Sequence, residues 1–418
     1  TLKGDRAGLI EALQTAPEQR NASDKKIIQE AFAAQDDSVS AFRKRQRELE
    51  AKVKKVQGNF PKVMVMADMP KPRQTFILER GLYNQRGKPV AAAVPSWLPP
   101  LSKTENPNRL DLARWLMDPN HPLTARVTVN RFWQMLFGVG LVKTTENFGV
   151  QTEYPRYPEL LEWLAAEFMQ SGWDVKALIR TIVTSETYRR SSTISSFAEY
   201  ERDPENRYLA RGSRFRMPSW MIRDQALAVS GLLNPQMGGK AVYSYQPTGI
   251  WAEATFGKKR FQQDKGKALY RRSLYTYWRR IIGPTMFFDV AKRQVCEVKP
   301  LRTNTPMHAL TVMNDVTYVE AGRALADIIL RDAKNDEARL RLAAQRVLGR
   351  NPSAEELTVL KHSLERGVAS FTEDPEAARR FLSHGDSKPQ SEVLPVTRAA
   401  WAALCLNLLN LDETLNKE

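Results

Sequence analysis

The spacing of apolar residues changes several times along the chain, and each change marks a different kind of segment. Between residues 8 and 57 apolar side chains recur every three or four positions, as in Leu9, Ile10 and Leu13. This spacing is typical of an amphipathic helix, because residues so placed share one helix face. The charged residues 42–56 that follow are expected to form an exposed helix. Residues 1–58 are therefore predicted to form a helical hairpin.

Residues 59–107 have a different pattern, which predicts short strands and a linker. Runs of β-type residues occur at 63–66 and 75–78, and prolines and a glycine separate them. Such runs predict a small pair of strands. Residues 88–107 then contain five prolines. Because proline fixes φ and removes a backbone donor, we expect an extended linker there.

Helical spacing returns after this linker and dominates the rest of the chain. The helices that it predicts span residues 108–117, 123–137, 158–170, 175–188, 221–233, 313–331, 338–348, 354–368 and 395–409. Glycine, proline and aspartate, which start or stop helices, bound several of them. The helical period is lost between residues 238 and 302, where aromatic, glycine and basic residues are frequent.

The predicted fold class is mainly α, a multi-helix domain with a small β-containing N-terminal segment and an irregular, aromatic and basic insertion. The helical domain covers residues 108–237, the insertion 238–306 and a C-terminal helical subdomain 307–418. With 42% apolar residues the chain can bury a core, which argues against global disorder. The length of 418 residues suits two or three packed units rather than one.

The net charge of +16 is concentrated in one part of the chain. Residues 251–302 hold thirteen basic and four acidic residues, a net charge of +9, and aromatic residues lie among them. Guanidinium groups bind anionic oxygens and flat rings stack, so this mixture suits an anionic polymer. Alternatively, the arginines pair with acids elsewhere and hold parts of the chain together.

The candidate ligand-binding residues lie in or just after this basic stretch. They are Arg271, Arg272, Tyr275, Tyr277, Trp278, Arg279, Arg302, Asn304 and His308. In a strand, Arg272 and Trp278 would share one face, and Arg271, Tyr275 and Tyr277 the other. His308 is expected to open a helix after a turn.

A second group of polar residues is assigned a structural role. Arg126 and Asn130 are four residues apart on a predicted helix that also carries Arg131, so the first two face one direction and are expected to brace residues 144–149. Arg223 and Asp224 are expected to form an internal ion pair at the start of another helix.

Most signatures of catalysis, metal binding and membrane insertion are absent from the sequence. The two cysteines, Cys296 and Cys405, can form one disulfide at most, and no CxxC pair occurs. The four histidines are scattered, so no metal site is predicted. Phosphate-binding loops, HExxH and GxSxG are also absent, and no apolar run approaches 18 residues. We therefore assign no catalytic residue, no cofactor within this chain and no membrane span.

Many short sequence motifs resemble the planctomycete cytochrome-associated C-terminal domain family, a domain of unknown function. The resemblance covers roughly residues 100–370, and residues 60–100 are similar to its usual lead-in. The motifs are Asn108–Leu116, His121–Val127, Asn130–Trp133, Phe137–Val142, Asn147–Gly149, Pro158–Leu164, Ser171–Lys176, Thr184–Ser185 with Tyr188–Arg189, Asn206–Gly212, Ile222–Gln225, Tyr270–Tyr275, Arg302–Pro306 and Asn410–Glu413. The family more often has glutamine at the position of His308.

The resemblance implies a context more than a mechanism. Domains of this family typically end large exported proteins, behind a c-type cytochrome module and a second domain of unknown function. Because Thr1 is neither an initiator methionine nor part of a signal peptide, we expect this chain to be a piece of something longer. The resemblance thus implies export to the periplasm or cell surface, partner modules upstream and a c-type haem in one of them.

The leading functional hypothesis is an extracytoplasmic accessory module that binds sulfated or carboxylated polysaccharide. One alternative is a redox enzyme or an electron-transfer scaffold that docks the upstream haem domain, and another is a structural component of a cell-envelope assembly. Nucleic acid is a less favoured partner, because no helix-turn-helix, zinc-finger or RRM signature occurs.

Overall fold

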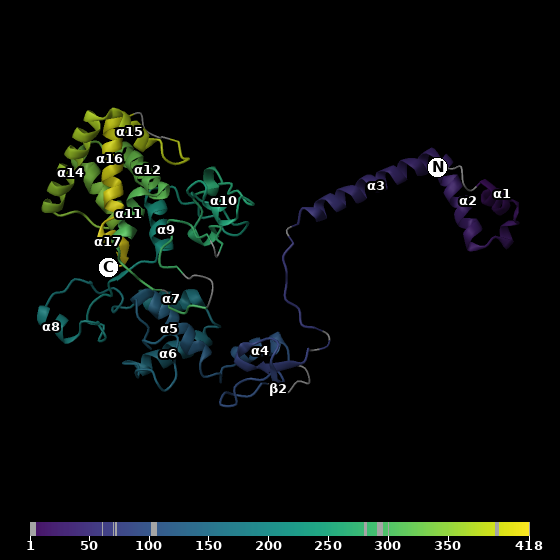
Figure 1. The fold of residues 1–418 in the computed structure, drawn as a ribbon, viewed down its shortest axis with the longest axis horizontal. Helices are drawn as coiled ribbons and strands as arrows, with labels where there is room; N and C mark the ends of the chain where they lie inside the picture. Colours follow the sequence, from purple (N-terminus) through teal and green to yellow (C-terminus); the bar gives the residue numbers. More distant parts are fainter. Residues whose placement is uncertain are drawn as a thin grey trace. The chain divides into compact units, whose positions relative to one another are not determined.

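The computed structural model describes residues 6–60, 62–69, 71, 73–101, 107–279, 282–290, 296–299, 301–388 and 393–417 (Figure 1). Helices account for 53% of the structure and strands for 4%, so the predicted mainly α fold is confirmed. Three of the basic residues counted above, Arg280, Lys292 and Arg293, lie outside the described residues. No helix in the described ranges is long and apolar enough to cross a membrane.

Contacts within the chain divide it into two compact units. The first comprises residues 1–92 with 104–109, and the second comprises residues 93–103 with 110–418. Three predicted segments, 108–237, 238–306 and 307–418, therefore belong almost wholly to the second unit.

The first unit contains three helices and a two-stranded sheet. The helices are α1 (Arg6–Gln14), α2 (Ala22–Gln35) and α3 (Asp37–Gly58). Helix α1 packs against α2, and α2 against α3. At the start of α2 the side chains of Asn21 and Asp24 each accept a hydrogen bond from the other's backbone N–H, which satisfies two donors that a helix end leaves unpaired.

The sheet corrects two predictions for residues 59–107. Strand β1 (Thr75–Leu78) was predicted, and it pairs antiparallel with β2 (Arg86–Val90), with Thr75 opposite Val90. The predicted strand at 63–66 is wrong, since residues 62–69 form no regular structure. The linker predicted from residue 88 begins later, because residues 88–90 belong to β2. Pro89 is tolerated there because both strands are edge strands.

In the second unit, three helices after α4 (Arg109–Leu116) enclose a small core. They are α5 (Thr124–Phe137), α6 (Pro158–Gln170) and α7 (Val175–Val183), followed by the short α8 (Phe197–Arg202). Val129, Trp133, Leu164 and Ile182 pack together in the core. Helix α7 ends at Val183, five residues earlier than predicted, because residues 184–189 form turns.

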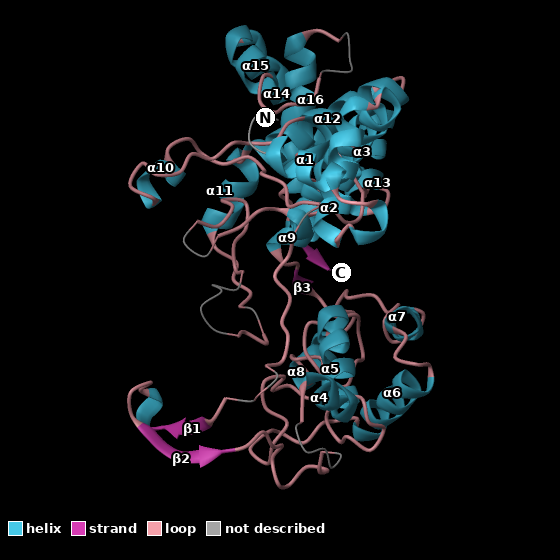
Figure 2. Ribbon diagram, turned by 90° about the vertical axis from the view of Figure 1, so that its right-hand side faces the viewer, coloured by secondary structure: helices cyan, strands magenta, loops and turns pink. Residues whose placement is uncertain are grey.

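A larger helical group in the second unit packs around α16 (Figure 2). Its helices are α9 (Ser219–Val229), α11 (Pro306–Asn314), α12 (Val316–Asp332), α13 (Asp336–Leu348), α14 (Ala354–Glu373), α15 (Pro375–Leu382), α16 (Pro395–Leu409) and α17 (Asp412–Leu415). Helix α16 is apolar on nearly every side, as expected for a helix at the centre of a core. The single helix predicted at 313–331 is instead interrupted at Asp315, whose carboxylate caps α12 by accepting from the Thr317 N–H.

Two short strands connect the two helical groups of this unit. Strand β3 (Phe215–Arg216) pairs antiparallel with β4 (Asn416–Lys417). Figure 2 shows them between helices α5–α7 and helices α12–α16. Sequence periodicity gave no sign of strands only two residues long.

A buried ion pair lies inside the larger group. Arg398 on α16 donates two hydrogen bonds to the carboxylate of Asp327 on α12, at 2.5 and 2.7 Å, and both side chains are buried. Removing one member of such a pair leaves an uncompensated buried charge.

Asp327→Asn should therefore lower the free energy of unfolding by roughly 3 kcal/mol. The matched control is Asp332→Asn, which removes the same charge from an exposed pair with Arg331 and should cost less than about 1 kcal/mol. Urea unfolding followed by circular dichroism measures both. Equal losses in the two variants would contradict a structural role for the Arg398–Asp327 pair.

Candidate functional site

Residues 238–279, called here the basic segment, form an irregular lobe beside α9 and α12 (Figure 1). Its only α-helix is α10 (Ile250–Ala254). The strand considered for residues 270–280 is not present in the described residues of that range, because Ser273–Tyr275 form a 3₁₀ turn. Nine basic and two acidic residues give this segment a net charge of +7.

Helix α9 holds one end of the basic segment through Arg223 and Asp224. The Arg223 guanidinium, 1% exposed, donates to the backbone carbonyls of Leu269 and Arg271, both at 2.9 Å. The Asp224 carboxylate accepts from the Ser273 N–H at 2.8 Å and lies 3.4 Å from Arg223. Burial lowers the pKa of Arg223, and the nearby Asp224 opposes that shift. The two residues thus form the predicted ion pair and fix the 269–273 turn.

Helix α12 holds the basic segment through the buried carboxylate of Glu320. Tyr245 and Tyr270 each donate a hydroxyl hydrogen bond to it at 2.8 Å, and the Ser387 N–H donates a third at 2.7 Å. Burial, with the adjacent Glu320 charge, raises the pKa of both tyrosines well above the ordinary value. Gly385 leaves room for this carboxylate, because a Cβ there would lie 2.3 Å from the Glu320 carboxyl carbon.

Several predicted ligand-binding residues face inward and hold the basic segment together. Arg271 is buried and donates to the carbonyls of Gln236, Gly238 and Lys240, and its guanidinium lies 3.7 Å from the ring centre of Tyr275. The predicted ring stacking is therefore satisfied within the chain.

Other aromatic residues of the basic segment contact one another. Tyr277 stacks on Tyr243 at 4.5 Å between ring centres, and the Arg279 guanidinium lies 5.8 Å from the ring of Trp251. Trp278 lies beside Phe287, at 6.1 Å. Tyr243, Tyr277, Trp251 and Arg279 form a small cluster, and Trp278 with Phe287 forms a separate pair.

The last three predicted ligand-binding residues lie outside this cluster. Arg302 donates to the Gly138 carbonyl at the end of α5 and stacks over Phe215 at 4.4 Å. Asn304 is exposed, whereas His308 is buried on α11 and stacks on Phe288 at 4.0 Å. The structure thus pairs Arg271 with Tyr275 and places Tyr277 and Arg279 beside Trp251, but it leaves these three and the exposed Arg272 apart.

The outer surface of the basic segment carries a separate group of cations. All are exposed, and none forms an ion pair with a carboxylate in the described part of the chain: Lys240, Lys258, Lys259, Arg260, Lys265, Lys267 and Arg272. Phe256 projects beside three of them, 93% exposed, where Phe256 and Gly257 turn the backbone at φ of 51° and 74°. Of these seven cations, only Arg272 is among the candidate ligand-binding residues predicted from the sequence.

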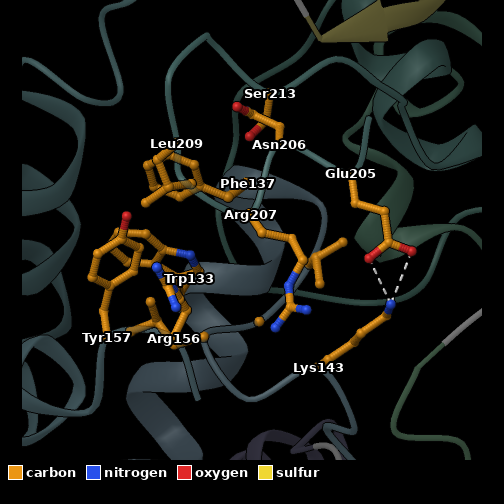
Figure 3. Close-up of a pocket in the computed structure, with 13 residues that line it drawn as sticks. Trp133, Phe137, Lys143, Arg156, Tyr157, Glu205, Asn206, Arg207, Leu209 and Ser213 are labelled. Carbon is orange, nitrogen blue, oxygen red and sulfur yellow. Dashed lines mark hydrogen bonds and ion pairs between the residues drawn. The ribbon is translucent and has the colours of Figure 1, made fainter. Parts of the chain in front are cut away.

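A cavity of about 280 Å³ that was not predicted from the sequence lies at the C-terminal end of α5 (Figure 3). Its lining comes from three separate stretches of the chain: Trp133, Phe137, Val139, Gly140, Leu141 and Lys143; Arg156 and Tyr157; and Glu205, Asn206, Arg207, Leu209 and Ser213. Residues so distant in sequence give no local signal of a shared site.

Asn130, from the predicted polar cluster on α5, does not line this cavity but holds the loop that carries the lining residues Gly140 and Leu141. Its side-chain amide donates to the Val142 carbonyl at 3.0 Å and accepts from the Val142 N–H at 2.8 Å. Gly140 permits this approach, because a Cβ there would lie 2.6 Å from the Asn130 amide nitrogen. Arg126 instead pairs with Glu162 on α6, which raises the pKa of Arg126, and Arg131 is exposed.

The described residues show no group of three or more histidine, cysteine, aspartate or glutamate side chains that could hold a metal ion. Cys296 and Cys405 are both free, the first exposed and the second buried. Among the side chains that the structure describes, the site therefore offers cations, hydroxyls and rings rather than metal ligands.

The raised pKa values of Tyr245 and Tyr270 predict a pH effect. An unfolded tyrosine loses its hydroxyl proton near pH 10, whereas Tyr245 and Tyr270 keep theirs in the folded state. The free energy of unfolding should therefore fall as the pH rises past about 10. Tyr245→Phe/Tyr270→Phe should show a shallower fall between about pH 10 and 11 than the unmodified chain. Urea unfolding at each pH gives the slope, with Tyr154→Phe at an exposed ring as control. Equal slopes in the double variant and the unmodified chain would refute the assignment.

Comparison with known proteins identifies a matching family, but no matching curated protein or solved structure. The family model PSD1, described as a protein of unknown function (DUF1553), matches residues 108–364, more than half of the chain. The matched range contains the cavity, the basic segment and both of its anchors. The chain belongs to the PSD1 family of proteins of unknown function (DUF1553).

Proposed function

We propose that this chain is a binding module for an anionic polysaccharide and that the outer surface of the basic segment makes the contact. The observation that carries the proposal is the set of seven exposed cations that pair with no described carboxylate. Cations already neutralised by neighbouring acids would offer a polyanion little, whereas these remain available to sulfate or carboxylate groups.

The arrangement of the cations supports a polymer rather than a single small anion. They are spread from Lys240 to Arg272, so each can meet a different charge of an extended chain. The exposed Phe256 ring adds a flat apolar surface next to Lys258. Inward-facing Arg271 would act by holding this surface in shape rather than by touching the ligand.

The proposed setting is outside the cytoplasm, next to a haem-carrying domain of the same protein. The resemblance to planctomycete cytochrome-associated domains supports this setting. An acidic surface on such a haem domain could bind the same exposed cations. Docking of the haem domain is therefore the alternative that the binding experiment must distinguish from polysaccharide binding.

The experiment measures binding of heparin and polygalacturonate, with neutral dextran as the uncharged polymer. Lys258→Gln/Lys259→Gln/Arg260→Gln should weaken binding about tenfold at low salt, since each exposed charge contact contributes roughly 0.5 kcal/mol. The affinity should also depend less on salt concentration in this triple variant than in the unmodified chain.

The matched control is Lys52→Gln/Lys54→Gln/Lys55→Gln on the exposed helix α3, which removes the same charge elsewhere. It should change the affinity by less than about twofold. Equal weakening by both triple variants would show that only overall charge matters. Failure of the unmodified chain to bind either polyanion would rule out the polysaccharide proposal and favour a partner domain.

A further inference from the structure

The cavity at the end of α5 has the size and lining of a small-molecule site. Its floor is apolar, with Trp133 stacked on Phe137 at 4.1 Å between ring centres and Leu141 and Leu209 beside them. A volume of about 280 Å³ lies at the small end of ligand pockets. A single ring with one or two substituents would fill it, whereas a polymer would not.

The Trp133 side chain provides an unused hydrogen-bond donor at this floor. Trp133 is 6% exposed and lines the cavity, and its indole N–H has no hydrogen-bond partner among the described residues. The indole nitrogen is not among the buried side-chain atoms that lack a partner, so this donor is open to the cavity. An oxygen atom of a bound ligand can accept a hydrogen bond from it.

Three cations surround the cavity, and their pairing leaves one of them without a carboxylate partner. Lys143 pairs with Glu205 at 2.8 Å, and Arg207 pairs with Glu153 at 2.5 Å. Arg156 pairs with no carboxylate in the described residues. Three positive and two negative groups leave a net charge of about +1, which matches one carboxylate better than a dianionic phosphate.

Arg156 is oriented so that it can still bind an anion. Its guanidinium lies over the Tyr208 ring, 4.4 Å from the ring centre, so the ring occupies one face. The N–H donors of a guanidinium lie in its plane and are not consumed by such stacking. Figure 3 shows the nitrogen atoms of Trp133 and Arg156 next to each other and those of Arg207 to their right.

The loop that carries Arg207 is held in a fixed shape. Asn206 and Leu209 have φ of 52° and 54°, in the left-handed region that costs a residue other than glycine roughly 1–2 kcal/mol. The Asp203 carboxylate accepts from two backbone N–H groups of the loop, and Arg190 donates to the Leu209 carbonyl at 3.0 Å. A loop held so firmly is suited to binding without reorganisation.

We propose that this cavity binds a small organic carboxylate with a ring-shaped body, of which a hexuronate sugar is the representative. Its carboxylate accepts from the guanidinium groups of Arg156 and Arg207. A ring oxygen or hydroxyl accepts from the Trp133 indole N–H, and the apolar ring face lies on the floor. The site is independent of the basic segment, because the two share no residue.

The test is isothermal titration of the full chain with D-glucuronate, and with D-glucose as the uncharged counterpart. Glucuronate should bind at least about tenfold more tightly than glucose, since a charge-assisted hydrogen bond contributes roughly 1.5–3 kcal/mol. Arg156→Gln and Arg207→Gln, both at exposed positions, should each weaken glucuronate binding about tenfold. Arg131→Gln, an exposed arginine of α5 outside the cavity, should leave it unchanged.

Four results would overturn the proposal. They are no binding of glucuronate, an affinity for glucose equal to that for glucuronate, a glucuronate affinity of Arg156→Gln and Arg207→Gln equal to that of the unmodified chain, or tighter binding of inorganic phosphate than of glucuronate. The triple variant at residues 258–260 separates the two proposed sites. If the triple variant still binds glucuronate, the result supports the cavity as the binding site. If the triple variant loses glucuronate binding and Arg156→Gln keeps it, the ligand belongs to the basic segment instead.

Discussion

The hydrogen bonds that α9 and α12 make to the basic segment are the constraint on which the candidate surface depends. The segment has almost no helix or strand of its own, so its backbone groups need partners from elsewhere. Arg223 and Asp224 supply them at the 269–273 turn, and Glu320 fixes Tyr245 and Tyr270. Each anchor is a charged side chain on a helix whose apolar faces belong to the core.

Because the segment is anchored in this way, its cations fall into two groups: buried ones that hold the backbone and exposed ones that can meet a ligand. Arg271 lies inside and replaces the missing strand hydrogen bonds by donating to three carbonyls. Lys258, Lys259 and Arg260 lie outside, where no described acid neutralises them. The net charge counted from the sequence includes both groups of cations, whereas the burial of each side chain in the structure tells them apart. The electrostatic field that a ligand meets comes mainly from the outer group.

The helices could be predicted because their apolar positions recur with the helical period and their ends carry glycine, proline or aspartate. The interruption at Asp315 was missed because apolar spacing continues across it, and the run at 63–66 was wrongly predicted as a strand because β propensity has no effect without a partner strand. The directions of Arg271 and His308 depend on tertiary contacts. So does the cavity at the end of α5, whose walls come from three distant stretches of the chain.

The most direct test of this account is hydrogen exchange of the backbone amides in Arg223→Met, which removes the guanidinium but keeps an apolar side chain of similar length. Because this variant loses the charged hydrogen bonds of Arg223, we predict that the exchange rate of the amides in residues 238–279 rises roughly tenfold to a hundredfold. The amides of α16 should keep their protection. Unchanged exchange in the basic segment, or an equal rise in α16, would contradict the claim that α9 holds the segment in place.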